Sequence, residues 1–145
     1  MEIFIPTWVD GTLQPVEKLQ THLRALRHKA VSVFIMRGNQ TLLQRRALKK
    51  YHTPGLWANA CCTHPEWNED GQACAIRRLT EELGVPPQIP VYRDTVEYRA
   101  NVGNGMVEHE VVEIFVVQAE AITIRPNPDE VMDYRWETLQ NLAGQ

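Results

Sequence analysis

The sequence predicts an α+β domain in which helices pack on a mixed β-sheet. Three observations lead to this prediction. A chain of 145 residues has the usual size of one domain. Two segments carry hairpin signals between apolar, β-branched runs, and a segment between them has the apolar spacing of a helix. No repeat, low-complexity tract or linker interrupts residues 1–145, so we expect a single unit.

The N-terminal part is predicted to hold a short helix followed by two strands. Pro15 precedes apolar residues at roughly helical spacing, which predicts a short helix or turn over residues 15–26. The stretch from 30 to 36 is apolar and β-branched, Gly38-Asn39 is a hairpin signal, and Leu42-Leu43 resumes a strand. This pattern predicts the first antiparallel pair.

The clearest helix is predicted in the middle of the chain. A helix entry at 68–71 is followed by apolar residues at intervals of three or four from Ala73 to Leu83, and Gly84 stops the helix. The other predicted elements are a loop over 45–57, a short strand over 58–60, an antiparallel pair over 90–99 and 107–118, a strand over 131–136 and a helix over 137–142.

Composition narrows the class of protein. The net charge of -3, from 15 basic and 18 acidic residues, argues against a general nucleic-acid binder. No apolar stretch approaches the ~20 residues that cross a bilayer, and the N-terminus has no basic leader region. The three cysteines lack the spacing of a disulfide framework. We therefore expect a cytoplasmic protein with reduced thiols and with no membrane or nucleic-acid partner.

Glu108 and Glu110 form the first candidate for a functional site. On a strand these two side chains point to one face, while His109 points to the other. Two neighbouring carboxylates repel each other, and a bound cation relieves that repulsion. The alternative is a solvent-facing strand with ordinary surface acids.

Histidines add to this candidate. His64 lies in the segment Cys61-Cys62-Thr63-His64-Pro65, where a Cys with a shifted pKa can exchange a proton and a neutral imidazole can bind a metal. The alternative is two buried thiols and one loop histidine. His22 and His28 would lie about 120° apart on a continuous helix, so the chain must leave the helix if both bind one ion. Together the candidates form a mixed nitrogen and oxygen set that suits zinc, manganese or iron better than magnesium: His22, His28, His64, Glu108 and Glu110.

Basic residues gather in two places although the chain is net negative, which favours a phosphate pocket over the alternative of a solvated loop. They are Arg45, Arg46, Lys49 and Lys50 before Pro54-Gly55, and Arg77 and Arg78 on the predicted helix. On that helix Arg78 shares a face with Glu81 and Glu82. This spacing fits either a salt-bridge ladder or carboxylates that hold a metal bridging to phosphate.

The predicted helix resembles the Nudix box. The residues that match in register are Glu69, Arg77, Leu79, Glu81, Glu82, Gly84 and Val85. Thr63 stands where the box has a glycine, and Arg78 replaces the first glutamate of its Arg-Glu pair. The resemblance implies the Nudix fold, an α/β/α sandwich, while Arg78 argues against the diphosphate hydrolysis that Nudix enzymes perform with magnesium.

Over nearly its whole length the chain is similar to the type 1 isopentenyl diphosphate isomerases, a Nudix branch with these two departures. The segments that carry the resemblance are Leu26-Arg27-His28, Gln44-Arg45-Arg46-Ala47, Pro54-Gly55-Leu56-Trp57 with Asn59, Cys62-Thr63-His64-Pro65, Tyr98-Arg99-Ala100, Val107-Glu108-His109-Glu110 and Asp129-Glu130-Val131-Met132-Asp133-Tyr134. The family continues beyond the last predicted helix, so we expect residues 1–145 to lack its C-terminal segment.

The resemblance implies roles for individual residues. Cys62 and Glu110 would transfer protons on opposite faces of the allylic unit, with Tyr98 assisting Glu110. A first ion, reported in the family as manganese, zinc or magnesium, would bind His22, His28, His64, Glu108 and Glu110. A second ion, magnesium held with the diphosphate, would bind Glu82 and the backbone carbonyl of Cys62. The diphosphate would bind Lys18, Arg46, Lys50 and Arg78.

The implied reaction is a reversible 1,3-proton shift between isopentenyl and dimethylallyl diphosphate in a monomer or weak dimer. Protonating an alkene gives a carbocation, and the aromatic faces of Trp57 and Tyr98 are candidates to stabilise it. Two alternatives remain at this point. One is a Nudix pyrophosphatase acting on a nucleotide or isoprenoid diphosphate, and the other is an inactive diphosphate-binding domain.

Overall fold

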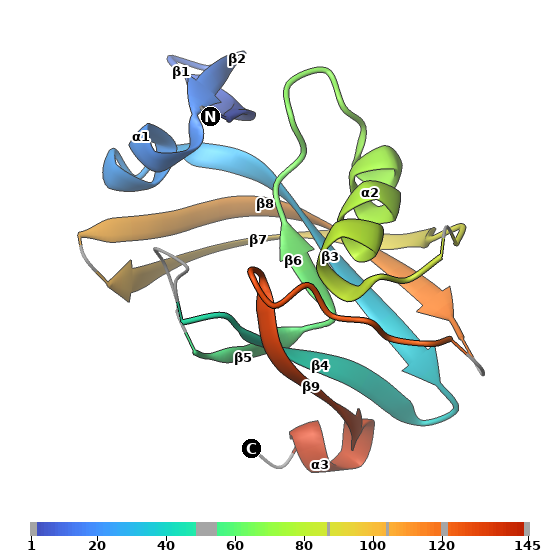
Figure 1. The fold of residues 1–145 in the computed structure, drawn as a ribbon. Coiled ribbons are helices and arrows are strands. Elements are labelled where there is room, and N and C mark those ends of the chain that lie inside the picture. Colours follow the sequence, from blue (N-terminus) through green and yellow to red (C-terminus); the bar gives the residue numbers. More distant parts are fainter. Residues whose placement is uncertain (1–2, 49–54, 87, 104, 120–121, 144–145) are drawn as a thin grey trace.

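The α+β class is confirmed by a computed structural model, which describes residues 3–48, 55–86, 88–103, 105–119 and 122–143 (Figure 1). The elements in these residues are β1 (Phe4–Val9), β2 (Thr12–Glu17), α1 (Lys18–Leu23), β3 (Arg27–Arg37), β4 (Gln40–Arg46), β5 (Trp57–Asn59), β6 (Cys61–Thr63), α2 (Gly71–Leu83), β7 (Val91–Gly103), β8 (Met106–Gln118), β9 (Val131–Thr138) and α3 (Leu139–Ala143).

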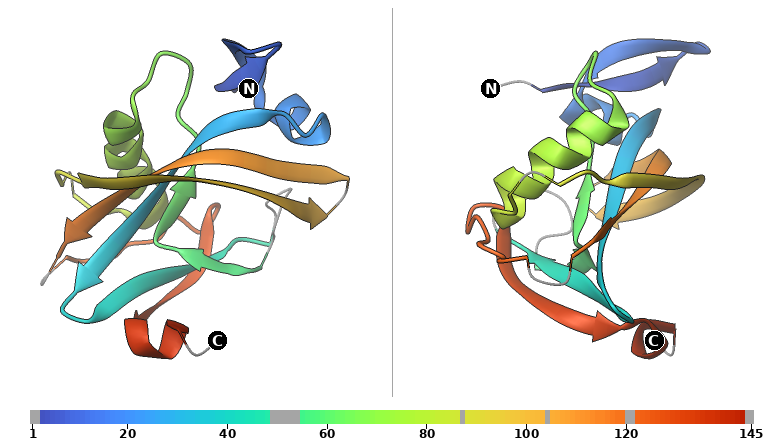
Figure 2. Two further views of the ribbon diagram at one scale, coloured as in Figure 1. Left: turned by 180° about the vertical axis from the view of Figure 1, so that it is seen from behind. Right: turned by 90° about the vertical axis from the view of Figure 1, so that its right-hand side faces the viewer.

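Strand β3 is the centre of a mixed sheet. It pairs antiparallel with β1, β4 and β6 and parallel with β8. Strand β7 pairs with β8, while β5 and β9 both pair with β4. Helix α2 lies against one face of the sheet, and the β1–β2 hairpin and α3 lie at opposite ends of the molecule (Figure 2). No helix in the described ranges has the length and apolar character needed to cross a bilayer.

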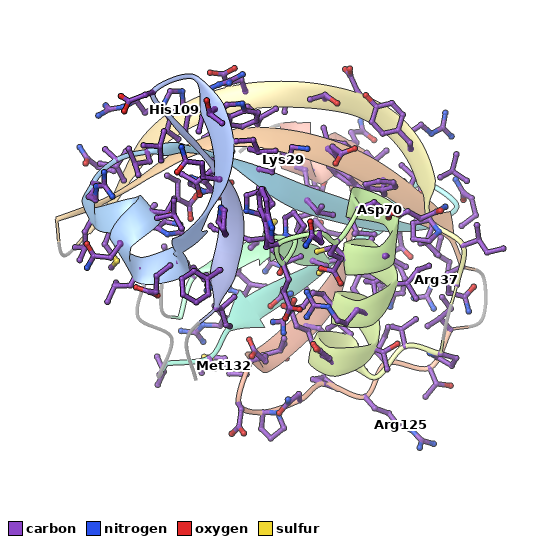
Figure 3. The ribbon with its side chains drawn as sticks, turned by 90° about the horizontal axis from the view of Figure 1, so that it is seen from above. Lys29, Arg37, Asp70, His109, Arg125 and Met132 are labelled. Atoms are coloured by element: carbon purple, nitrogen blue, oxygen red, sulfur yellow. The ribbon has the colours of Figure 1, made fainter. Side chains whose placement is uncertain are left out.

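Helix α2 forms where the sequence predicts it because both of its ends are capped. The Asp70 side chain accepts a hydrogen bond from the Ala73 amide at 2.7 Å, as a helix N-cap does, and Figure 3 labels Asp70 at the start of the helix. Gly84 ends the helix in the left-handed conformation, with φ of 63°. The apolar stripe between these caps, which includes Leu79 and Leu83, is buried.

The two faces of β3 have different uses. Val31, Val33 and Ile35 are buried in the core between the sheet and α2. Because side chains alternate along a strand, His28 and Ser32 lie on the opposite face. One strand therefore supplies the hydrophobic core and carries polar residues on its other face.

The hairpin of β1 and β2 differs from the prediction, which places no strand before residue 26. Asp10 and Gly11 have φ of 51° and 79°, the positive values that a two-residue type I′ turn requires. Asp-Gly between apolar residues is the sequence signal that identifies this hairpin. As a result, the helix expected over 15–26 is confined to Lys18–Leu23.

The other elements follow the prediction with three differences. The first expected strand pair diverges, since β3 and β4 pair only at Met36–Thr41 and Arg37–Gln40 before β3 pairs with β6 instead. The expected loop over 45–57 is shorter, because Arg45 and Arg46 belong to β4 and Trp57 begins β5, while residues 49–54 lie outside the described residues. Strand β6 is an additional strand, because the sequence-based prediction places no element over residues 61–63.

Candidate active site

Four buried side chains converge where α1, β3, β6 and β8 meet. Each of them offers a possible ligand atom, and these atoms all lie within 4.8 Å of one another: His22, His28, His64 and Glu110. The ring centroids of the three histidines are 4.9 to 5.1 Å apart. The structure therefore assembles four of the five residues that the sequence analysis assigns to the first ion.

Local structure explains how His22 reaches this group. Helix α1 is capped by the Glu17 carboxylate, which accepts from the Leu19 amide at 2.9 Å and the Gln20 amide at 3.2 Å. The chain then leaves the helix after Leu23 and turns through Ala25, whose φ is 55°, into β3. This turn confirms the expectation that the chain leaves the helix between His22 and His28.

Two of the three histidines have the tautomer that a metal centre needs. Nδ1 of His22 donates to the Lys18 carbonyl and Nδ1 of His28 donates to the Leu26 carbonyl, both at 2.8 Å, because a carbonyl oxygen can only accept. Nε2 of each ring is then the possible ligand atom. Nε2 of His28 lies 3.2 Å from Oε2 of Glu110, so two lone pairs face each other when the imidazole is neutral. A cation between them relieves this repulsion.

The protonation states fit the same interpretation. Burial lowers the pKa of His64 to about 3, despite the opposing effect of Glu110, so this imidazole is neutral near pH 7. Burial alone would raise the pKa of Glu110, but its contacts with His28, His64 and Tyr98 lower it below its usual range. Three imidazoles and one carboxylate form a donor set that fits a divalent transition-metal ion.

Tyr98 connects the cluster to Glu108. Its hydroxyl lies 2.6 Å from Oε1 of Glu110 and 2.7 Å from Oε2 of Glu108. Burial and these carboxylates raise the pKa of Tyr98, which keeps the hydroxyl protonated. Tyr98, Glu110 and His28 are register partners across β7, β8 and β3 and thus form one row on the sheet. Glu108 lies beside that row, and its ligand role stays a prediction.

Cys62 and Glu110 face the same space. Both line a cavity of about 190 Å³, whose other lining residues are Arg46, Leu56, Trp57, Ala58, Thr63, His64, Tyr98 and Glu108. They also line an adjoining, more apolar cavity of about 200 Å³, which extends along β3 and β8 past Phe34, Val112 and Ile114. A thiol, a carboxylate and two aromatic rings therefore surround one partly apolar pocket.

The Cys62 thiol is protonated near neutral pH. Desolvation by the surrounding protein raises its pKa to about 11, while the Ser32 hydroxyl, 3.7 Å from the sulfur, acts in the opposite direction. Cys61 points to the other side of β6, where its thiol donates to Oε2 of Glu82 at 3.3 Å. The two adjacent thiols thus lie in different environments, and only Cys62 is exposed.

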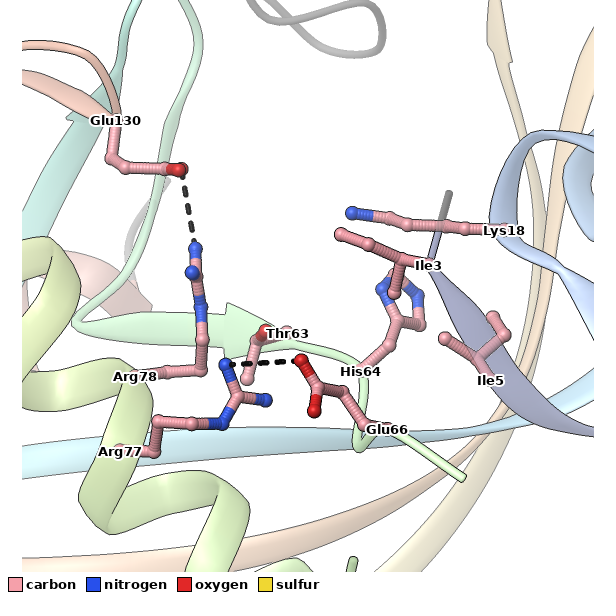
Figure 4. A pocket seen from close by; sticks show the side chains of 9 residues that line it. All are labelled: Ile3, Ile5, Lys18, Thr63, His64, Glu66, Arg77, Arg78 and Glu130. Atoms are coloured by element: carbon pink, nitrogen blue, oxygen red, sulfur yellow. Dashed lines mark ion pairs between the residues drawn. The ribbon is translucent and has the colours of Figure 1, made fainter. Parts of the chain in front are cut away.

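Basic residues border the cluster on another side. Lys18 and Arg78 line a pocket of about 100 Å³ together with His64 and Thr63, and Figure 4 shows Arg78 reaching into it from α2 opposite Lys18. Arg46 lines the cavity of Cys62 instead. Lys50, the fourth residue predicted to bind the diphosphate, lies outside the described residues.

Glu82 is buried and tightly held. Its carboxylate accepts from Gln44 at 3.0 Å, from Cys61 at 3.3 Å and from Arg78 at 3.1 Å. Arg78 also pairs with Glu81 at 3.3 Å, so the salt-bridge ladder that the sequence allows is present on α2. The role of Glu82 as a ligand of a second ion stays a prediction.

Other residues at this site are absent from the sequence-based assignments. Ser32 contacts Cys62, and Asn59 contacts Ser32. Glu130 pairs with Arg78 at 3.2 Å across the basic pocket. Arg135 places its guanidinium 4.6 Å from the ring centroid of Trp57. Asn59 and Glu130 lie in segments that carry the family resemblance, but no local pattern assigns a role to any of the four, so only tertiary contacts reveal their place in the site.

Comparisons with known proteins give a consistent result. The NUDIX domain model matches residues 26–145. The chain is 58% identical over 146 residues to an isopentenyl-diphosphate Delta-isomerase of Dinoroseobacter shibae, covering 100% of this chain and 83% of that protein. It is 64% identical over 145 residues to an isopentenyl-diphosphate Delta-isomerase of Jannaschia sp., covering 99% of this chain and 82% of that protein.

Solved structures resemble the fold at lower sequence identity. A MutT protein from Methanosarcina mazei Go1 has a TM-score of 0.69 at 18% identity and covers 82% of each chain. A protein of Deinococcus radiodurans has a TM-score of 0.72 at 17% identity, covering 99% of this chain and 87% of that one. These likenesses concern the fold alone.

Proposed function

The chain belongs to the NUDIX family and, within it, to the isopentenyl-diphosphate Delta-isomerases, and on this premise we propose that it interconverts isopentenyl and dimethylallyl diphosphate by a metal-dependent 1,3-proton shift. The observation that carries the proposal is the shared pocket of Cys62 and Glu110. One group there holds a transferable proton, and the other is an ionised base.

The protonation states of Cys62 and Glu110 support one direction for each proton transfer. Cys62 is a thiol near neutral pH, so its Sγ–H bond breaks as a C–H bond forms at the terminal alkene carbon. Glu110 is a carboxylate, so it accepts the proton that leaves the carbon on the other side of the cation. In the reverse direction the two groups exchange roles. Tyr98, hydrogen-bonded to Glu110, holds that carboxylate in place.

The walls of the pocket suit a cationic intermediate. Trp57 and Tyr98 both line the cavity and offer aromatic faces to a tertiary carbocation. The adjoining apolar cavity accommodates hydrocarbon and keeps water away from the reacting carbons. The diphosphate would bind Lys18, Arg46, Lys50 and Arg78, which hold the five-carbon tail between the thiol and the carboxylate.

A manganese, zinc or magnesium ion would be held by His22, His28, His64 and Glu110, with Glu108 as a fifth ligand. Such an ion supplies positive charge and fixes the orientation of Glu110. A second ion, magnesium, would accompany the diphosphate at Glu82 and the backbone carbonyl of Cys62. Arg78 donates to Glu82, so the guanidinium that would bind the diphosphate lies beside the carboxylate that would hold this ion.

The protein would act in the cytoplasm on this small substrate as a monomer or weak dimer, without nucleic acid. Its cysteines are free, which is compatible with a reducing compartment.

The test is incubation of the metal-reconstituted protein with isopentenyl diphosphate. Isomerisation gives an acid-labile allylic product, whereas a pyrophosphatase releases phosphate. An inactive binding domain gives neither, although a calorimetric titration detects diphosphate binding. Phosphate release without allylic product would refute the proposal.

A further inference from the structure

Ser32 and Asn59 form a hydrogen-bonded chain that ends at the Cys62 sulfur. Nδ2 of Asn59 lies 2.9 Å from Oγ of Ser32, and Oγ of Ser32 lies 3.7 Å from Sγ of Cys62. We propose that Ser32 is a positioning residue for Cys62, with a hydroxyl hydrogen that the Asn59 amide directs at the sulfur. This inference rests on the proposed function, in which Cys62 is the proton donor.

The contacts of Asn59 fix the direction of the chain. Its Oδ1 accepts from the Ala60 amide at 2.9 Å, which places the side-chain NH₂ group toward Ser32. Oγ of Ser32 therefore accepts from Asn59. The single hydroxyl hydrogen of Ser32 is then available to a second acceptor, and the Cys62 sulfur is within reach for one.

The backbone holds this geometry rigidly. Ser32 and Cys62 are register partners in the antiparallel pair of β3 and β6, so their side chains lie on the same face. Asn59 ends the neighbouring strand β5, which pairs with β4. Ser32 and Cys62 thus come from paired strands, and Asn59 donates to Ser32 from the end of β5.

The hydrogen bond gains strength as the reaction proceeds. When Cys62 gives its proton to the alkene, the Sγ–H electron pair stays on sulfur and the thiol becomes a thiolate. The Ser32 hydroxyl donates to that developing charge without transferring its own proton. Phe34, Val112 and Ile114 line the cavity beside this pair, and an apolar wall strengthens a charge-assisted hydrogen bond. Ser32 therefore stabilises the transition state more than the ground state.

Variants of Ser32 test the inference through kinetics. Ser32→Ala is expected to lower kcat about 10- to 100-fold, with KM changed by less than about three-fold. Ser32→Thr keeps the hydroxyl donor, so it should recover most of the lost rate. A Ser32→Ala enzyme with kcat within about two-fold of the wild type would overturn the proposal, and so would a Thr variant no better than the Ala variant.

Asn59→Asp tests the direction of the chain. A carboxylate of nearly the same shape still accepts from the Ala60 amide, but it cannot donate to Ser32 and instead accepts the Ser32 hydrogen. We expect a loss of kcat like that of Ser32→Ala and no further loss in the double variant. If the reductions of kcat in Asn59→Asp and Ser32→Ala add fully in the double variant, Asn59 does not act through Ser32 and the proposal is wrong.

Alkylation by iodoacetamide gives a readout that needs no turnover. Cys61 and Cys74 are buried, so modification at a fixed pH reports on Cys62, the exposed thiol. Loss of the Ser32 donor is expected to slow the modification of Cys62 several-fold, and Ser32→Thr is expected to react like the wild type. Equal alkylation rates in the wild type and Ser32→Ala would contradict the inference. A wild-type protein that fails to isomerise would refute the proposed function, while this alkylation series would still decide the role of Ser32.

Discussion

Replacing Glu110 by Gln should remove the metal centre while leaving the fold intact. The carboxylate is 6% exposed, and Oε2 lies within 3.2 Å of both His28 and His64. A glutamine fills the same volume, its oxygen can still accept from Tyr98, and its NH₂ group can donate to a neutral imidazole. We therefore expect the free energy of unfolding of the metal-free protein to change by less than about 1 kcal/mol. What the variant loses is the only negative charge in the group of four.

The weaker metal binding of Glu110→Gln can be expressed as a smaller metal-induced shift in melting temperature. At a metal concentration one hundred times the wild-type Kd, binding stabilises the native state by about 2.7 kcal/mol. At about 3 °C per kcal/mol for a domain of this size, Tm rises by about 8 °C. Even partners outside the ligand set contribute 10- to 100-fold to affinity, so we take the loss of this anionic ligand as about 100-fold. The same metal concentration then equals the Kd of the variant and raises Tm by only about 1 °C.

The assay is a thermal melt with and without manganese or zinc, together with the metal content by elemental analysis. Glu113→Gln is the matched control, because it makes the same substitution on β8 at a position on the opposite face. The control should keep the full metal-induced shift and the activity, whereas Glu110→Gln should lose both. A Glu110→Gln protein with full metal occupancy and an undiminished Tm shift would refute the assignment.

Three further predictions concern catalysis and stability. Cys62→Ala should abolish isomerisation while leaving diphosphate affinity by calorimetry within a few-fold, and equal activity would remove Cys62 from the mechanism. Arg77 holds the pKa of Glu69 below its usual value, so the stability that this ion pair contributes is present above about pH 4.5 and is lost as the pH falls further. Glu69→Gln should therefore lower Tm by about 3 °C at pH 7. Thermal melts near pH 3 should show a much smaller difference between the variant and the wild type. Gly84→Ala should destabilise the protein by about 2–4 kcal/mol, because the added Cβ would collide with the Arg125 carbonyl oxygen at a φ of +63°. Denaturant melts should show a much smaller loss of about 1 kcal/mol for Gly38→Ala, where φ is also positive but no atom lies within 4 Å.

Local signals account for most of the fold that the sequence predicts. The cap at Asp70, the stop at Gly84 and the apolar spacing between them define α2 to within a few residues. The long β7–β8 hairpin follows from β-branched runs. The parallel pairing of β3 with β8 has no local signal, because the two strands are separated by other elements and their register depends on burial.

The candidate site, like the fold, is predictable from the sequence only in part. Residue types and motifs identify Cys62, Glu110 and the three histidines as candidates, and the structure gathers them. The residue type alone cannot identify Ser32 as a residue of the site, because the sequence around a serine on a strand does not show which residue lies opposite it on the neighbouring strand. Its contact with Cys62 depends on the register of β3 and β6, which no short sequence pattern states.

The four residues that could hold an ion come from positions far apart along the chain, and this has a consequence for folding. His28 and Glu110 are separated by 82 residues, and His64 and Glu110 by 46. A chain that has formed only its local hairpins holds no complete set of ligands, since the long-range pairing of β3 with β8 must come first. Metal uptake should therefore be a late step that locks the finished topology, and slow loss of the ion should accompany global opening of the molecule.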